Sequence, residues 1–156
     1  MKKPNPHPEQ QSALSAGSIL RRNVARILLG AALLFAGISH LSTARATFVA
    51  QVPAWVPLSP DFVVVASGIV EIILGLALIV LLKQKAIIGL VVALFFIAIF
   101  PGNISQLVTH TDAFGLNDDA SRIIRLFFQP LLVLWALWST GAWRYLRNHM
   151  MVSFAK

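Results

Sequence analysis

The chain of 156 residues contains no cysteine. Disulfide bonds, thiolate metal sites, iron–sulfur clusters and Cys-x-x-Cys redox chemistry are therefore excluded within this chain. The sequence also lacks the motifs of a P-loop, a dinucleotide-binding fold, a zinc protease and a serine hydrolase. It carries neither a paired-histidine haem pattern nor a metal-ligand motif, so no bound metal is predicted.

Charged residues are scarce as well. They make up 12% of the chain, whereas hydrophobic residues make up 57%, and the mean hydropathy is +0.75. Soluble domains carry about a quarter charged residues, and a soluble domain of this length could not bury so much apolar surface. The composition therefore excludes a soluble globular enzyme, a disordered chain and a nucleic-acid-binding domain, and it indicates an integral membrane protein.

Four apolar segments approach the length of a membrane-spanning helix, which needs about 20 residues. The predicted spans are residues 24–41, 62–82, 86–104 and 123–143. None alternates with a period of two, so barrel strands are not expected. The first segment also has features of a cleavable signal peptide, but 26 residues precede its apolar run, and a retained helix is the working interpretation. The expected fold is all-α, a four-helix up-down bundle over residues 19–148.

The net charge is +7, from 13 basic and six acidic residues, and the basic residues are unevenly distributed. Ten of the 13 precede the first span, lie between the second and third spans, or follow the fourth: Lys2, Lys3, Arg21, Arg22, Arg26, Lys83, Lys85, Arg144, Arg147 and Lys156. Basic residues favour the cytoplasmic side, so both termini are predicted to be cytoplasmic. Residues 1–18 are expected to form a flexible cytoplasmic tail, and residues 149–156 a second tail.

Glycines and two ionisable residues mark one face of each of the first two spans. In the second span, glycines lie three residues before Glu71 and four after it, on the same helical face. In the first span, two glycines and His40 share a face at spacings of seven and three residues. Small residues let helices approach closely, so the predicted helix-packing positions are Gly30, Gly37, Gly68 and Gly75. Glu71 is either a polar staple between helices or a functional group, and His40 either an interfacial residue or a ligand-binding one.

The third and fourth spans contribute further polar groups. Asn103 follows a Pro-Gly pair, where it either ends the helix or lines a cavity. Arg125 and Gln129 share a face of the fourth span. A buried arginine needs a partner, and Glu71 is the natural one for Arg125, directly or through Gln129, water or a ligand. The candidate ligand-binding residues, which converge on the outer half of the bundle, are therefore His40, Glu71, Asn103, Arg125 and Gln129.

Five strings of residues, taken together and in order, resemble the DoxX-like family of small bacterial membrane proteins. They are FAGISH at 35–40, VPAWVP at 52–57, SGIVE at 67–71, FPGNI at 100–104, and Arg125 followed by Gln129-Pro130. The resemblance covers about residues 24–143, and it departs from the family in having Pro-Gly-Asn where Pro-Ala-Asn is expected. It implies a four-helix protein of the bacterial cytoplasmic membrane. It also implies a link to quinone-dependent redox complexes, in which some members of the family are subunits.

Three functional hypotheses follow from these residues and this resemblance. The first is a quinone-binding or accessory subunit of a membrane redox complex, in which His40 and Arg125 hold a carbonyl oxygen and Glu71 handles protons. The second is a non-catalytic membrane anchor or stabilising partner of another protein, with the polar residues acting as interhelical contacts. The third, a small proton-coupled transporter, is least supported because four short spans without repeats offer little machinery for alternating access.

Overall fold

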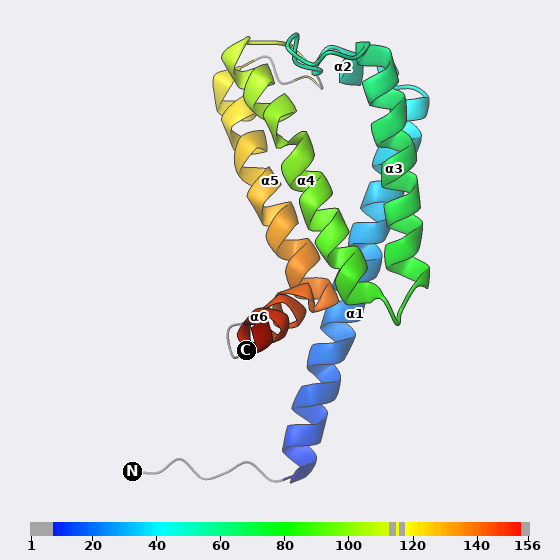
Figure 1. Cartoon of the computed structure of the whole chain (residues 1–156), viewed down its shortest axis with the longest axis vertical. Coiled ribbons are helices and arrows are strands. Elements are labelled where there is room, and N and C mark those ends of the chain that lie inside the picture. The colour runs from blue at the N-terminus through cyan, green and yellow to red at the C-terminus, as the bar shows by residue number, and fades with distance from the viewer. Residues whose placement is uncertain (1–7, 113–114, 116–117, 154–156) are drawn as a thin grey trace.

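The computed structural model describes residues 8–112, 115 and 118–153. Within these ranges the chain forms helices and no strand, which confirms the all-α prediction. The helices are α1 (Pro8–Leu41), α2 (Arg45–Val49), α3 (Pro60–Val80), α4 (Lys85–Val108), α5 (Asp119–Thr140) and α6 (Ala142–Ser153). The four long helices alternate in direction, and the short helices α2 and α6 lie at opposite ends of the bundle (Figure 1).

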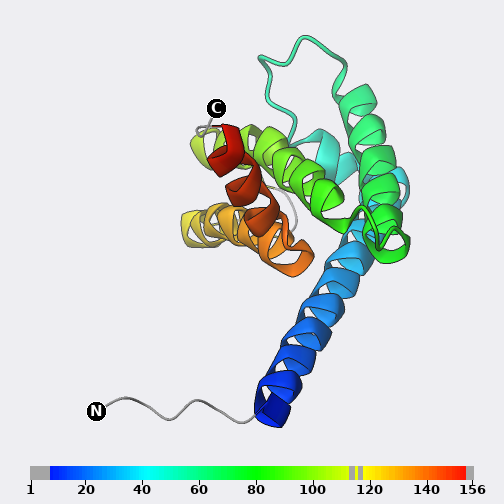
Figure 2. The same cartoon turned by 60° about the horizontal axis from the view of Figure 1, so that its bottom comes forward.

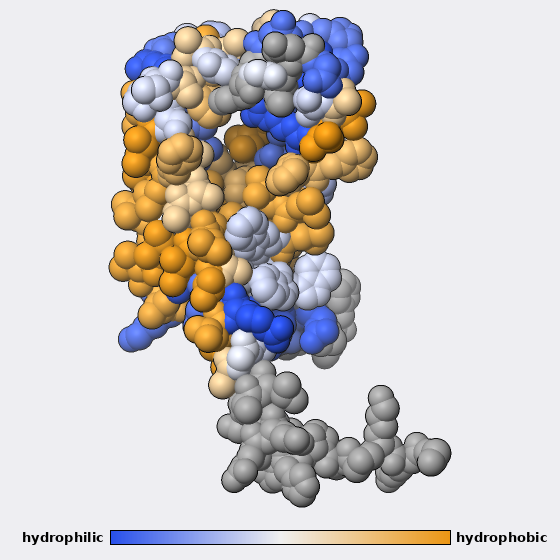
Figure 3. Space-filling model, turned by 180° about the vertical axis from the view of Figure 1, so that it is seen from behind, coloured by the Kyte–Doolittle hydropathy of each residue, from blue (hydrophilic) through white to orange (hydrophobic). Residues whose placement is uncertain are grey.

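Four of these helices are long and apolar enough to cross a membrane: Ala16–Leu41, Pro60–Val80, Lys85–Val108 and Asp119–Thr140. Each corresponds to one predicted span. Large apolar side chains such as Ile73, Leu94 and Leu131 are more than half exposed on the outside of the bundle, and they belong to the broad apolar surface visible in Figure 3. A surface of this kind is suited to lipid rather than to water.

Two predicted boundaries differ from the structure at the beginning and end of the chain. α1 begins at Pro8, so residues 8–18 are helical and not a flexible tail; proline is tolerated at the first helical position, and good helix formers follow it. Residues 1–7 of that predicted tail lie outside the described residues. The last span ends at Thr140, because Gly141 adopts the left-handed conformation with φ of 79°. α6 then continues to Ser153, into the predicted second tail.

The third span is also longer than predicted. α4 continues through Pro101 to Val108, so Asn103 lies inside the helix and does not end it. A proline within a helix removes the hydrogen bond to the carbonyl four residues earlier, which here is that of Ile97. The helix tolerates this loss, and its last two turns carry polar side chains toward α5.

The carboxyl ends of α3 and α5 are both stabilised by arginines from α1. Arg26 is 2% exposed, and its guanidinium donates hydrogen bonds to the carbonyls of Leu78 and Ile79 at the end of α3. One turn earlier, Arg22 Nε donates to the carbonyl of Trp138 at 3.0 Å, near the end of α5. The last carbonyls of a helix lack partners within it and carry partial negative charge, so a guanidinium there is stabilising.

The amino end of α5 is capped by Asp118. Its carboxylate accepts hydrogen bonds from the hydroxyl of Ser121 at 2.7 Å and from the Ser121 N–H at 2.8 Å. These two donors lower the pKa of Asp118 from its ordinary value of 3.8, because they stabilise the ionised carboxylate. The ionised carboxylate of Asp118 therefore stabilises the amino end of α5.

The long helices form two pairs, α1 with α3 and α4 with α5, which lie side by side in Figures 1 and 2. In the first pair the backbones touch at two levels. A Cβ atom added to Gly30 would lie 2.8 Å from the carbonyl oxygen of Gly75, and one added to Gly37 would lie 2.6 Å from that of Gly68. The four predicted packing glycines therefore lie at the contact between α1 and α3.

The two pairs meet at the end of the bundle opposite α2. The apolar core there consists of Leu29, Leu33, Leu74, Leu78, Ile88, Val92, Ala93, Phe96 and Ala136. Toward α2 the pairs diverge, as Figure 1 shows, and the segment containing α2 bridges them. This divergence creates the space in which the polar residues of the spans lie.

Candidate functional site

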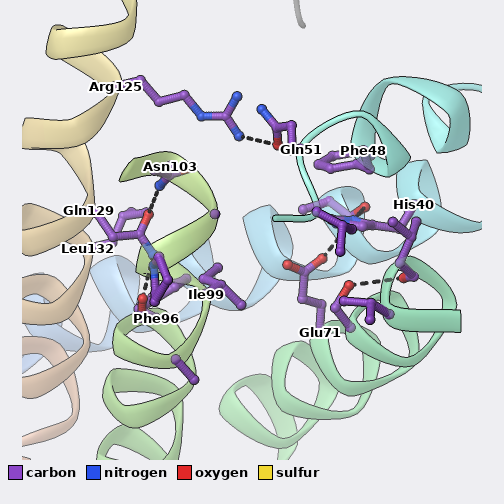
Figure 4. A pocket seen from close by; sticks show the side chains of 18 of the residues that line it. His40, Phe48, Gln51, Glu71, Phe96, Ile99, Asn103, Arg125, Gln129 and Leu132 are labelled. Atoms are coloured by element: carbon purple, nitrogen blue, oxygen red, sulfur yellow. Dashed lines mark hydrogen bonds and ion pairs between the residues drawn. The ribbon is translucent and has the colours of Figure 1, made fainter. Parts of the chain in front are cut away.

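A cavity of about 700 Å³ separates the two helix pairs at the α2 end. Its walls are mainly apolar and come from α1, α3, α4 and α5, and residues in and after α2 cover it. The polar residues that line it are His40, Gln51, Ser67, Glu71, Asn103, Ser121, Arg125 and Gln129. All five candidate ligand-binding residues predicted from the sequence are among them, and they form three groups around the cavity (Figure 4).

The first group joins His40 of α1 to Glu71 of α3. His40 Nδ1 lies 3.0 Å from Glu71 Oε2 and 2.8 Å from the carbonyl oxygen of Ala36. His40 Nδ1 thus faces two acceptors at once, and no other hydrogen-bond donor from the described part of the chain reaches Glu71 Oε2. Both side chains are buried, with His40 7% and Glu71 4% exposed. The carboxylate oxygen is thus held beside an imidazole but is incompletely satisfied, which is costly in an apolar surrounding.

Two neighbours fix the position of the His40 ring. Phe48 of α2 stacks on it, with ring centroids 3.5 Å apart and planes inclined by 20°. On the opposite helix, a Cβ atom added to Gly68 would lie 2.8 Å from the Cβ of His40. The absence of a side chain at Gly68 therefore allows His40 to approach α3 and reach Glu71.

The second group lies on the facing pair, α4 and α5. Gln129 Oε1 accepts a hydrogen bond from Asn103 Nδ2 at 3.0 Å, and Gln129 Nε2 donates to the carbonyl of Phe96 at 2.7 Å. Phe96 precedes Ile97, whose carbonyl loses its helical donor because Pro101 has no N–H. Asn103 and Gln129 line the cavity and tie α4 to α5 on either side of Pro101, through Phe96 and Asn103 and not through the carbonyl of Ile97.

The third group lies at the α2 end and joins three segments. Arg125 of α5 donates to Gln51 Oε1 at 2.9 Å and to Gln106 Oε1 at 3.1 Å. Gln51 Nε2 in turn donates to Gln106 Oε1 at 2.8 Å. Gln51 follows α2, so these bonds tie the α2 segment to α4 and α5.

The expected pairing of Arg125 with Glu71 is therefore wrong in its direct form and in the form mediated by Gln129, whereas a link through water or a ligand stays a prediction. Glu71 has His40 as its ion-pair partner, whereas Arg125 is held by the side chains of Gln51 and Gln106. The reason is geometric: close packing at the glycines brings α1 against α3, whereas α5 belongs to the other pair, across the cavity. Gln129 bonds to Asn103 instead of linking Arg125 to Glu71.

Sequence reasoning missed Gln51, Phe48 and Gln106. Gln106 lies three residues after Asn103 and therefore on the same helical face, which is a signal that could have identified it. Gln51 lies in a segment between spans, where no helical period relates it to the other polar residues. Phe48 is one of ten phenylalanines in an apolar sequence, so its type alone did not distinguish it.

Residues 29–140 match a family model described as a domain of unknown function (DUF8561). The match covers 112 of the 156 residues, and the chain belongs to this family. Searches of curated proteins and of solved structures gave no match. The family description assigns no activity, so the function has to be argued from the cavity.

Proposed function

We propose that this chain is a multi-pass protein of the bacterial cytoplasmic membrane that binds a quinone, or a similar amphipathic ligand, between its two helix pairs. We further propose that it acts as a subunit of a membrane redox complex, with both termini in the cytoplasm. Kinship with DoxX-like proteins is part of this proposal and rests on the ordered sequence motifs. The orientation rests on the ten basic residues at one end of the spans.

The observation that carries the proposal is the incompletely satisfied carboxylate of Glu71 facing an apolar cavity. A site built to recognise a small ligand combines apolar walls with a few convergent polar groups. Glu71 Oε2 has no donor beside it among the described residues except His40 Nδ1, at 3.0 Å, which also faces the carbonyl oxygen of Ala36. A purely structural polar contact between helices would be expected to satisfy its own atoms. An acceptor left open beside an imidazole supports a role in binding.

The residues around the cavity fit the chemistry of a quinone. A bound quinone would supply carbonyl oxygens that accept hydrogen bonds and take up protons on reduction. Glu71 can donate a hydrogen bond when protonated and accept one when ionised, and His40 lies within reach of its proton. Arg125 adds positive charge and N–H donors at the α2 end. Apolar residues deeper in the cavity, including Leu29 and Leu33, would contact an attached chain.

Binding of a decyl-substituted benzoquinone to the purified protein in mild detergent tests this proposal. Trp55 lines the cavity, so quenching of its fluorescence reports occupancy, and loss of the signal in Trp55→Phe identifies the reporter. We expect Glu71→Gln and His40→Ala to weaken binding at least about tenfold, because a hydrogen bond to a charged group contributes about 1.5–3 kcal/mol.

Asp112→Asn is the matched control for Glu71→Gln. Asp112 is also an acidic residue, but it is exposed and pairs with Arg122 outside the cavity. It should bind the quinone as the unmodified protein does. Unchanged affinity in both Glu71→Gln and His40→Ala, with helical content intact, would reject the proposal. A stoichiometric protein partner without any small molecule, found by native mass spectrometry of the lipid-extracted protein, would favour the anchor hypothesis instead.

A further inference from the structure

We infer that the ligand of this cavity is a chain-bearing amphiphile dissolved in the membrane, and that it enters sideways from the lipid between α1 and α5. This inference rests on the proposed function, because it assumes that the cavity binds an amphipathic ligand. Beyond that function, it specifies the chemical class of the ligand and the route by which the ligand enters. Three features support it: a cover at the α2 end, an opening between α1 and α5, and the depth of the apolar part.

The α2 end of the cavity is covered by a segment that is anchored at both ends. At its start, Arg45 makes two hydrogen bonds to the Asp61 carboxylate, at 2.7 and 2.6 Å, which tie α2 to α3. Further along, Gln51 is bonded to Arg125 and Gln106, as described above. Val52, Pro53, Trp55 and Val56 then line the cavity before the chain reaches α3. The cover therefore extends from α4 and α5 to α3 and separates the cavity from the water at this end.

The same segment lies against α4. The carbonyl oxygen of Gln51 is 3.6 Å from the position of a Cβ atom on Gly102, which is ordinary van der Waals contact. Because the chain runs from this contact to Ser59 at the start of α3, it bridges α3 and α4. At this end the bond between Gln51 and Arg125 also ties the segment that follows α1 to α5. Below it, Ala32 of α1 and Phe128 of α5 both line the cavity and are both exposed on the outside of the bundle. Residues of α1 and α5 therefore border both the cavity and the outer surface below this cover.

Toward the other end, α1 and α5 are joined by Trp135, whose indole N–H donates to the carbonyl of Ala25 at 3.0 Å. The helices run in opposite directions, so seven residues further up, Ala32 lies at the level of Phe128 on α5. Four residues further up, Ala36 lies at the level of Ile124. At each of these three levels the residue on α1 is an alanine. These four upper residues line the cavity. The small alanines leave a slot between the helices above Trp135.

The rim of this slot is apolar and faces the lipid. Phe128 is 58% and Ile124 60% exposed on the outer surface of α5, although both also line the cavity. The space-filling view from behind shows a hollow in the upper part of this face, with apolar atoms beside and below it and hydrophilic ones at its upper edge (Figure 3). A water-soluble molecule would have to cross the hydrocarbon region to reach such an opening, whereas a molecule already dissolved in lipid would not.

The depth of the cavity fits an apolar chain below a polar head. Its lining on α1 extends from His40 down to Leu29, a separation of eleven positions that corresponds to about 16 Å along a helix. That is about half the thickness of the hydrocarbon core of a bilayer. A head group held at His40 and Glu71 would therefore leave its chain in contact with Leu29, Leu33 and Leu132, or extending through the slot into lipid.

Narrowing the slot tests this route. The protein is reconstituted in lipid nanodiscs, and the rates of decyl-benzoquinone binding and release are followed by Trp55 fluorescence. Ala32→Phe and, as a second variant, Ala36→Phe should slow both rates at least about tenfold while the Kd changes less than about threefold. Ala31→Phe is the matched control, since Ala31 is the neighbouring exposed alanine and does not line the cavity. It should retain the rates of the unmodified protein.

The class of ligand is tested with the same quinone lacking its chain, which should bind at least about a hundredfold more weakly. Equal affinity for the chain-free quinone would overturn the ligand class. Rates in Ala32→Phe and Ala36→Phe equal to those of Ala31→Phe would overturn the route, as would faster binding when the cover is loosened by Gln51→Leu. Failure of the proposed function itself looks different: the unmodified protein would show no saturable binding of either quinone.

Discussion

Replacing Gly37 by alanine tests whether direct contact of backbones holds α1 and α3 together. The added Cβ atom would lie 2.6 Å from the carbonyl oxygen of Gly68 and 2.8 Å from Cγ1 of Ile72. Ordinary contacts of a Cβ atom begin near 3.4 Å. The helices would therefore have to separate by about 0.8 Å, the difference between 3.4 and 2.6 Å. Overpacking of this kind costs about 1–3 kcal/mol.

Gly102→Ala is the matched control for this substitution. Alanine is favoured over glycine within a helix by about 1 kcal/mol, and this gain applies to Gly37 and Gly102 alike because both are helical. At Gly102, however, the added Cβ atom would meet only the Gln51 carbonyl oxygen within 4 Å, at an unstrained 3.6 Å. The propensity gain cancels between the two variants. Gly37→Ala should therefore be less stable than Gly102→Ala by about 1–3 kcal/mol.

The difference is measured by unfolding each variant in dodecyl maltoside micelles with increasing fractions of sodium dodecyl sulfate, followed by far-ultraviolet circular dichroism. We expect Gly37→Ala to unfold at a lower fraction of the denaturing detergent than Gly102→Ala. Identical midpoints for the two variants would refute the argument, because they would mean that α1 and α3 do not depend on the close approach at Gly37.

Three further predictions concern the helix ends and the cover. Arg26→Gln should destabilise the protein by about 1–3 kcal/mol in the same assay, since the buried guanidinium satisfies two carbonyls at the end of α3; an unchanged midpoint would contradict this. The hydrogen bonds from Ser121 lower the pKa of Asp118, so its stabilising effect should be complete above about pH 3.8 and be lost as the pH falls through the lowered value. Asp118→Asn should therefore lose less stability than the unmodified protein between pH 6 and pH 3, and equal losses would argue against the cap. Gln51→Leu should loosen the cover and speed tryptic cleavage after Arg45, whereas unchanged cleavage would show that the hydrogen bonds of Gln51 do not hold it.

Much of the helical framework could be predicted from the sequence, because hydropathy and helical period are local properties. The four predicted spans correspond to α1, α3, α4 and α5, with differences at their ends. Those differences have local causes that the apolar pattern does not reveal. The left-handed conformation of Gly141 ends α5 early. α4 continues past Pro101 to Val108, and Gln129 of α5 bonds to it on both sides of the proline, at Phe96 and at Asn103.

Helical period also related Glu71 and His40 to the glycines on their own helices. That relation needs no knowledge of neighbours, since residues three, four and seven apart share a face. The sequence could not say which helix each face would meet. It was this choice that made His40, and not Arg125, the partner of Glu71.

The sequence alone therefore determined the class of protein, the number of long helices and the polar residues placed within them. Only the tertiary structure decided that the helices form two pairs, that the pairs diverge, and that the polar residues surround a cavity of about 700 Å³. The physical reason is that a cavity and an ion pair depend on distances between segments far apart in the chain. Those distances are set in part by how closely the backbones of α1 and α3 pack, at Gly30, Gly37, Gly68 and Gly75. They are also set by the segment after α2, which places Gln51 within hydrogen-bond distance of Arg125.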